Sequence, residues 1–217
     1  MPFMLIFLPR VLRRPVLIVN LLFSLYLSGC QTTTPTIATS VANTNTAPIT
    51  ASTLPDFPLL APVSLGYAIS EQQQVTARYG NQTGSSLVMV DVVTDTPPVR
   101  VSLLSTGLLG VRLFSVDYDG QTLKSENSVF IPKGFKPQAV LADYQISRWP
   151  LGVLQQALQN TSWQVTQPNA LLRELSYQHV PVLSVTYDDI GAQSFTVRHH
   201  VYGYEVQIVV LPDEGDE

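Results

Sequence analysis

Alternation of apolar and polar residues dominates the chain after Asp56 and predicts β-strands. Runs rich in Val, Leu, Tyr and Phe recur about every ten residues between Gly, Pro, Asn and Asp, a pattern typical of an antiparallel meander. The ten runs are Gln74–Tyr79, Ser86–Thr94, Val99–Ser105, Val111–Tyr118, Gln121–Ser125, Ser162–Thr166, Leu171–Tyr177, Val182–Tyr187, Ser194–Val201 and Tyr204–Val210. Asp119-Gly120, between two of these runs, is a hairpin signal.

The last two runs separate an apolar face from a polar one. Their apolar faces comprise Phe195, Val197, His199, Val201, Tyr204, Val206, Ile208 and Val210. Such a pattern suits a sheet curled around an apolar interior. Ser86–Val93 is apolar on nearly both faces, so we expect another element to cover it on the outside.

Helical spacing interrupts the strands between Lys136 and Gln159. Leu151, Leu154 and Leu158 fall on one stripe of a helix. Pro150 suits a first helical turn and breaks or kinks the segment Lys136–Gln159 at that point. We therefore predict a mainly β (α+β) fold: an antiparallel, half-open β-barrel of about ten strands with a two-helix insertion covering the opening. This insertion is also the expected cover for Ser86–Val93.

The N-terminal residues have the pattern of a lipoprotein signal peptide. Three arginines, at 10, 13 and 14, precede an apolar segment that ends in the lipobox Leu27-Ser28-Gly29-Cys30. The apolar run from Pro15 to Ser28 is shorter than the roughly 20 residues of a transmembrane helix, which argues against an uncleaved anchor. Residues 1–29 are thus predicted to be removed, and Cys30 to carry the lipid.

The segment after Cys30 is predicted to be a flexible tether. Residues 31–55 consist mainly of Thr, Ala, Ser, Asn and Pro, with almost no large apolar side chain and no charge. Such a segment buries too little surface to offset the entropy of ordering it. Its reach is about 25–30 Å. We assign 30–56 to the lipidated cysteine and tether, and 57–217 to a single domain.

Net charge and cysteine content argue against several classes of partner and site. The mature chain keeps nine of the twelve basic residues and all sixteen acidic ones, a net charge of −7 that disfavours nucleic acid. Cys30 is the only cysteine, so no thiol remains for a disulfide or a thiolate metal site.

Chemistry-bearing patterns are absent from the sequence, which predicts neither an enzyme nor a cofactor nor a metal site. There is no Gly-x-Ser-x-Gly elbow and no phosphate-cradling glycine loop. In an extended strand His199 and His200 point to opposite faces, and His199 is expected in the core. Asp143 and Arg148 lie in the helical segment, and Arg78, Arg100 and Arg112 lie in strands. Each is expected to form a salt bridge or to face the solvent, and a lipid head group at the cavity mouth is the alternative partner for an arginine.

Several segments together resemble a family of proteobacterial lipoproteins of unknown function that is often encoded in aryl polyene pigment gene clusters. They are Leu103–Leu113, Tyr118-Asp119-Gly120, Val140–Ile146 with Trp149-Pro150, and Gly203-Tyr204. The order of elements is also similar to the lipoprotein carriers LolA and LolB. The resemblance implies a half-open barrel whose helices lie over an apolar cavity for acyl chains.

From this resemblance we expect a cavity and a membrane-contact loop. The candidate cavity lining is Val88, Val90, Leu103, Leu113, Tyr144, Leu154, Phe195, Val197, Val206 and Ile208. In LolB an apolar loop residue helps delivery to the outer membrane, and Leu108 and Leu109 lie at a similar point between glycines. The alternative is that this leucine pair is buried between two strands.

The sequence therefore predicts a lipoprotein of the outer membrane, anchored through Cys30 with its domain facing the periplasm. Its expected partners are the membrane, a lipid or lipoprotein acyl chain (an aryl polyene lipid among the candidates) and an envelope carrier or transporter, without catalysis. The alternative is a structural or assembly subunit of an envelope transporter or biosynthetic complex, with a solid interior.

Overall fold

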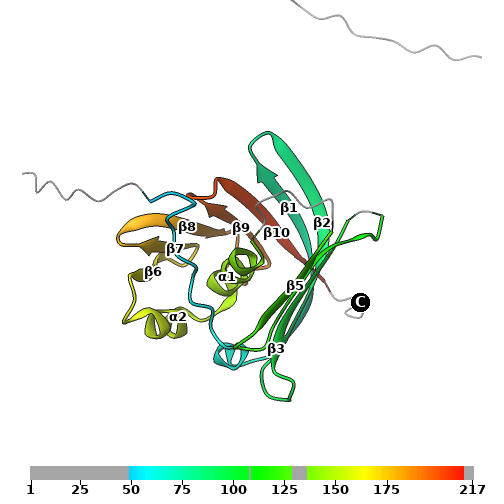
Figure 1. Ribbon diagram of the computed structural model, residues 1–217, viewed down its shortest axis with the longest axis horizontal. Helices are drawn as coiled ribbons and strands as arrows, with labels where there is room; N and C mark the ends of the chain where they lie inside the picture. The colour runs from blue at the N-terminus through cyan, green and yellow to red at the C-terminus, as the bar shows by residue number, and fades with distance from the viewer. Residues whose placement is uncertain (1–48, 108, 129–135, 213–217) are drawn as a thin grey trace, which may run out of the picture. The chain divides into compact units, whose positions relative to one another are not determined.

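The computed structural model describes residues 49–107, 109–128 and 136–212. The chain divides into two units, Met1–Asn45 and Thr46–Glu217, and the described residues belong to the second. Within them, ten strands form one sheet, accompanied by two α-helices and a 3-10 helix (Figure 1). The strands are β1 (Ile69–Tyr79), β2 (Gln82–Val93), β3 (Arg100–Thr106), β4 (Arg112–Tyr118), β5 (Leu123–Asn127), β6 (Trp163–Asn169), β7 (Leu172–Tyr177), β8 (Val180–Tyr187), β9 (Ser194–His199) and β10 (Tyr204–Leu211). The helices are η1 (Pro62–Leu65), α1 (Pro137–Arg148) and α2 (Leu151–Leu158).

The sheet is antiparallel throughout and does not close. Its order is β5-β4-β3-β2-β1-β10-β9-β8-β7-β6, so β5 and β6 are its two edges, and the first strand, β1, pairs with the last, β10, in the middle of the sheet. Each of the ten predicted runs overlaps one strand, and the insertion forms two helices. The predicted mainly β, half-open architecture is confirmed.

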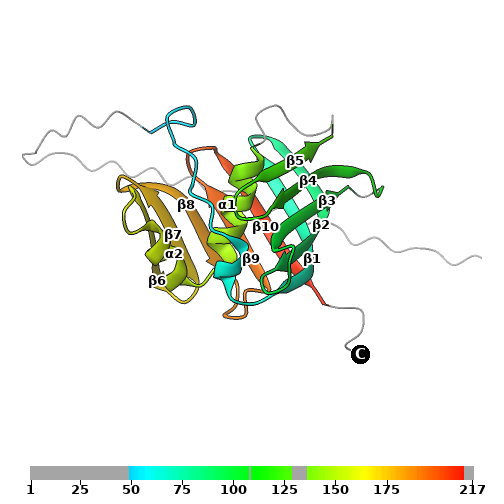
Figure 2. The ribbon, with the colours of Figure 1, turned by 60° about the horizontal axis from the view of Figure 1, so that its bottom comes forward.

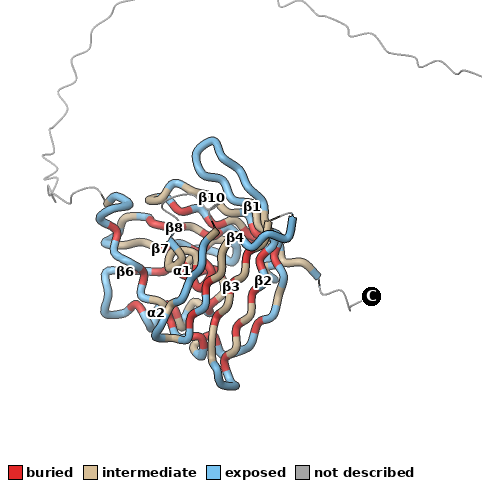
Figure 3. The backbone as a smooth tube through the Cα atoms, turned by 45° about the vertical axis from the view of Figure 1, so that its right-hand side comes forward, coloured by how far each residue is buried: buried red, intermediate tan, exposed pale blue. Residues whose placement is uncertain are grey.

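Side-chain alternation gives the sheet one apolar face, which is the concave one. Val88, Val90 and Val92 of β2 are buried on it, as are Phe195 and Val197 of β9. Helix α1 lies within the curve of the sheet (Figures 1 and 2). The buried residues of strands and helices form a single core cluster, and the tube coloured by burial shows buried and exposed residues alternating along the strands (Figure 3).

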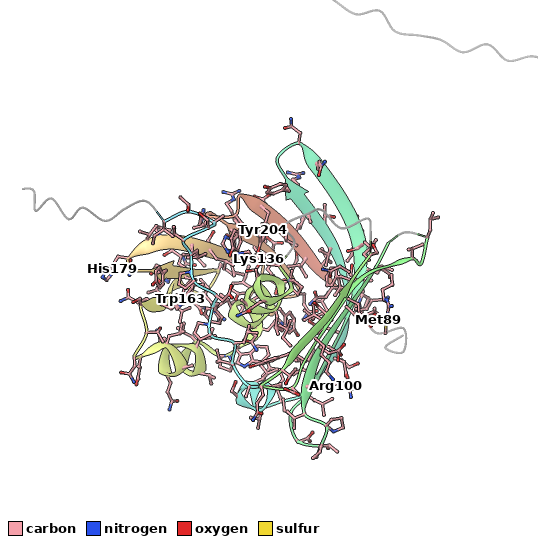
Figure 4. The ribbon with its side chains drawn as sticks, viewed as in Figure 1. Met89, Arg100, Lys136, Trp163, His179 and Tyr204 are labelled. Atoms are coloured by element: carbon pink, nitrogen blue, oxygen red, sulfur yellow. The ribbon has the colours of Figure 1, made fainter. Side chains whose placement is uncertain are left out.

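The expected cover on the outer face of β2 is wrong. Both helices lie on the concave side, and on the opposite face Leu87 and Met89 are 37% and 59% exposed. Figure 4 shows Met89 on the side of the sheet away from α1. The physical reason is that the sheet curves around the helices, whose apolar side chains are buried in the core on the concave side.

Two local predictions follow the expected chemistry. The hairpin turn between β4 and β5 has Gly120 at φ +98°, and the N–H groups of Gln121 and Thr122 donate to Asp119 Oδ1 at 2.9 and 2.7 Å. At the helix break, Trp149 and Pro150 are extended (ψ 145° and 137°), which separates α1 from α2.

Candidate functional site beneath helix α1

Helix α1 seals the concave face together with the segment that precedes β1, residues 49–66, which we call the strap. Leu141, Ile146 and Trp149 have no exposed surface, and Phe57 and Leu60 of the strap are buried with them. Burying a side chain of this size contributes about 1.5–3 kcal/mol. Figure 1 shows the strap running alongside α1. Any ligand of the concave face therefore has to displace one or both segments.

The C-terminal turn of α1 is fixed by side chains from β7 and β8. Nη1 of Arg173 donates to the carbonyl oxygens of Ile146 and Trp149 at 2.6 and 2.8 Å. Tyr187 donates its hydroxyl hydrogen to Ser147 O at 2.8 Å. These carbonyls have no partner within the helix. The positive charge of Arg173 also interacts favourably with the negative, C-terminal end of the helix dipole. The turn is thus bonded to the sheet by buried, permanent donors.

A buried amide joins the middle of α1 to the strap. Gln145 has no exposed surface, and its Oε1 accepts from the N–H of Leu60 at 2.8 Å while its Nε2 donates to Leu60 O at 2.7 Å. Both strap backbone groups are thereby satisfied in the interior, as buried polar groups require. This reciprocal pair positions the strap against α1.

A titratable pair holds the side of α1 that faces the β9–β10 turn. Tyr204 donates its hydroxyl hydrogen to Asp143 Oδ2. Burial raises the pKa of Asp143 to about 7, although the hydrogen bond from Tyr204 partly opposes that rise. Beside it, Lys136 Nζ donates to Tyr202 OH at 3.2 Å; Figure 4 labels Lys136 and Tyr204 on this side of α1. The contact between Asp143 and Tyr204 therefore depends on whether the Asp143 carboxyl is protonated.

His199 lies buried next to this pair, in the core as predicted. It is 5% exposed, its ring stacks on Tyr202 with centroids 4.2 Å apart, and its Nδ1 accepts from the N–H of Tyr202 at 3.2 Å. Burial lowers the pKa of His199 to about 4. The imidazole is therefore neutral at pH 7.

A second buried polar cluster crosses from α1 to β1. Arg148 Nη2 and Glu71 Oε2 are 2.7 Å apart, and their side chains are only 13% and 11% exposed. Gln73 donates to the other oxygen of Glu71 at 2.7 Å. Tyr144 OH and Arg148 Nε, both buried, have no hydrogen-bond partner among the described residues. Burying an ion pair costs desolvation that its attraction only partly offsets, so this cluster orients α1 more than it stabilises it.

Little free volume remains between the strap, α1 and strands β6 to β9. A hollow lined by residues such as Phe57, Asp143 and Trp163 measures about 30 Å³. That is room for a water molecule or two, whereas ligand pockets measure roughly 300–1,000 Å³. In this arrangement the hollow holds no alkyl chain.

The predicted cavity residues lie mostly in the packed core. Those buried there are Val88, Val90, Leu103, Tyr144, Leu154, Phe195, Val197 and Ile208, and Val206 packs against them half-buried. Leu113 instead shares the other face of β4 with Ser115 and Asp117, next to a register shift of the β3–β4 pair. The structure thus brings nine of the ten residues together, in contact with one another rather than around an open space.

The predicted loop is exposed where the structure describes it. Leu109 is 92% exposed and the neighbouring Val111 is 48% exposed, so Leu109 is not a core residue. Leu108 and the lipidation candidate Cys30 lie outside the described residues. Among the residues that are described, no helix is long and apolar enough to cross a membrane, and no group of His, Cys, Asp or Glu is arranged to hold a metal ion.

Comparison with protein families finds a match for this chain. Residues 70–212 match the family of proteins of unknown function DUF3261, which covers all ten strands except the first residue of β1. The chain belongs to this family. No curated protein matches it. The matched region contains the whole of α1, whereas the strap (residues 49–66) precedes it.

The polar groups that hold α1 were largely missed by sequence reasoning. Asp143 and Arg148 were noted only as members of a salt bridge or a surface, and Arg173 and Gln145 were not singled out. A polar residue within an apolar helical stripe, such as Gln145, is a usable signal. Arg173 gives none, because its partners lie 24 and 27 residues away in the sequence.

Proposed function

We propose that this DUF3261 protein is a lipoprotein that binds and transfers an acyl chain at the outer membrane, without catalysis. Cys30 carries the anchoring lipid and the domain faces the periplasm. The cargo is a lipid or lipoprotein acyl chain, and an aryl polyene lipid is one candidate. The resemblance to LolA and LolB, together with the open sheet, supports this proposal.

One observation supports it: an apolar concave sheet face is covered by a helix that is attached by polar contacts as well as by its apolar side chains. Gln145, Arg148 and Asp143 hold α1 by hydrogen bonds and an ion pair. Water can satisfy these groups once α1 moves away, so exposing them costs less than exposing an apolar helix. Outward movement of α1 would free the valines of β2 and β9 for an acyl chain.

Photo-crosslinking in cells tests cargo binding with the intact chain. Cells producing the full protein receive a diazirine-bearing fatty acid, and the crosslinked peptides are identified by mass spectrometry. We expect label on Tyr144 and on concave-face residues such as Val90 and Val197. Label confined to the loop around Leu109 would indicate bilayer contact alone, and an unlabelled domain would overturn the proposal.

A variant of the exposed loop separates loading from delivery. Leu109→Glu should leave the free energy of unfolding within about 0.5 kcal/mol of wild type, because the side chain is 92% exposed. It should keep the concave-face label while lowering transfer of that label to acceptor membranes. Val63→Glu is the control, since Val63 is 59% exposed on the strap and away from this loop.

A second function, an assembly subunit of an envelope complex, is supported by a different observation. The hollow beneath α1 is only about 30 Å³, while Leu87 and Met89 leave apolar surface on the outer face of the sheet. A stable complex that is isolated with the full chain and lost in Met89→Glu would favour this alternative.

A further inference from the structure

An open pocket lies at the end of the sheet where β1, β9 and β10 meet their turns. Its volume is about 370 Å³, at the lower end of the range for ligand pockets. The residues that matter for its chemistry are Arg78, Arg198, His200, Glu205, Gly80 and Gly203. A Cβ added at either glycine would have no neighbouring atom within 4 Å, so both turns leave the rim open.

Three charged residues stand in one row across the pocket. In the strand register Glu205 of β10 lies opposite Arg78 of β1 on one side and opposite Arg198 of β9 on the other. Glu205 Oε2 accepts from Arg198 Nη2 at 2.5 Å and from Arg198 Nε at 3.0 Å. The carboxylate is therefore engaged by one of its two arginine neighbours.

In this arrangement the side chain of Arg78 has no ion-pair partner in the part of the chain that the structure describes. Four other arginines each pair with a carboxylate: Arg100 with Asp91, Arg112 with Glu126, Arg148 with Glu71, and Arg198 with Glu205. Arg173 donates to backbone carbonyls. Among the described residues, Arg78 is the only arginine whose side chain makes no hydrogen bond or ion pair, and Nη1 of Arg198 makes none there either. Free guanidinium donors thus line the pocket from both sides of Glu205.

We propose that this pocket binds a phosphate group. Guanidinium forks match the oxygens of phosphate, and such charge-assisted pairs are about twice as strong as neutral hydrogen bonds. The volume accommodates a phosphate with a small polar substituent, such as glycerol phosphate. The source is either a free phosphate ester or the head group of a lipid. This inference does not depend on the carrier proposal, because it concerns a polar surface pocket outside α1.

Titration calorimetry of the full chain in non-ionic detergent tests the site, with sn-glycerol 3-phosphate as the first probe. Dihexanoyl phosphatidylglycerol and dihexanoyl phosphatidylcholine, which are soluble short-chain lipids, are the second and third. Binding of all phosphate probes with equal affinity identifies the phosphate alone as the ligand. Tighter binding of phosphatidylglycerol identifies an anionic lipid head group. Both results support the site.

Charge variants make the proposal falsifiable. Arg78→Gln should weaken glycerol phosphate binding at least fivefold, whereas Glu205→Gln should strengthen it several-fold by removing the competing carboxylate. Arg100→Gln is the matched control, because Arg100 is also on a strand but pairs with Asp91 at 3.0 Å. All variants should unfold within about 2 °C of wild type, since these residues are at the surface. Equal affinities in Arg78→Gln, Glu205→Gln and wild type, or no binding at 20 mM probe (roughly the weakest binding that simple titration resolves), would overturn it.

Discussion

The C-terminal turn of α1 and the Asp143 side of the same helix are held in different ways. Arg173 and Tyr187 bond the turn through groups whose protonation does not change near neutral pH. Asp143 bonds Tyr204 through a carboxyl with a pKa near 7, beside a histidine whose pKa is about 4. The comparison indicates that α1 has a fixed end and a side whose attachment responds to conditions.

The largest expected effect is at the fixed end. Arg173→Met keeps the length of the side chain but leaves the carbonyls of Ile146 and Trp149 buried without their donor. We expect a loss of about 3–4 kcal/mol in the free energy of unfolding, measured by urea denaturation. Arg112→Met, at an exposed ion pair, should cost at most about 1 kcal/mol. Similar losses in the two variants would show that the turn is not the fixed end.

The responsive side should appear in the pH dependence of stability. Between pH 4 and 6.5 the Asp143 carboxyl is ionised in the unfolded chain but protonated in the fold, so it makes stability fall as pH rises. His199 is protonated in the unfolded chain but neutral in the fold over that window, so it makes stability rise. The two effects, each about 3 kcal/mol, oppose each other.

Removing one of the two groups should therefore reveal the effect of the other on how the free energy of unfolding changes between pH 4 and 6.5. Asp143→Asn should become more stable from pH 4 to 6.5, and His199→Gln less stable, by about 2–3 kcal/mol each, while wild type changes less than either. Urea denaturation at several pH values measures this. The surface variant Asp117→Asn is the control. Parallel profiles for Asp143→Asn and His199→Gln would contradict the burial of these two groups.

Sequence patterns predicted the elements of this fold but not how they meet. Alternation located all ten strands, and Pro150 located the break between α1 and α2, because both signals are local. The cover expected on the outer face of Ser86–Val93 was predicted wrongly, since Leu87 and Met89 look as apolar in the sequence as Val88 and Val90. Which side of a two-sided apolar strand becomes buried is decided by the curvature of the whole sheet.

The site was less predictable than the fold for the same reason. Its apolar residues follow from alternation, so Val90, Val197 and Ile208 were named in advance. The link between Gln145 and Leu60 spans 85 residues and depends on where the strap crosses α1. Leu54, within the range predicted as tether, is buried in the core, because a lone apolar residue gives no periodic signal.

A smaller effect is expected in the middle of α1, where the amide of Gln145 joins the strap. Gln145→Met conserves volume but removes both hydrogen bonds to Leu60, and we expect a loss of about 2 kcal/mol in urea denaturation. Gln155→Met in α2 is the matched control, because that exposed amide makes one 3.4 Å contact with Val165 O and should change stability by less than about 0.5 kcal/mol. If Gln145→Met were equally neutral, the strap would not depend on this contact.

The smallest expected effect lies beside Asp143, at the surface contact between Lys136 and Tyr202. Lys136 Nζ is 4.9 Å from the centroid of the Tyr202 ring and 3.2 Å from its hydroxyl oxygen. At an exposed position such a contact contributes about 0.5 kcal/mol, and salt weakens it. Lys136→Met should therefore lower the free energy of unfolding by about that amount at low salt and by less at 1 M NaCl, with Lys124→Met as the charge control. A loss comparable to that of Arg173→Met would mean that both ends of α1 are equally fixed, and the proposed outward movement would then have no side from which to begin.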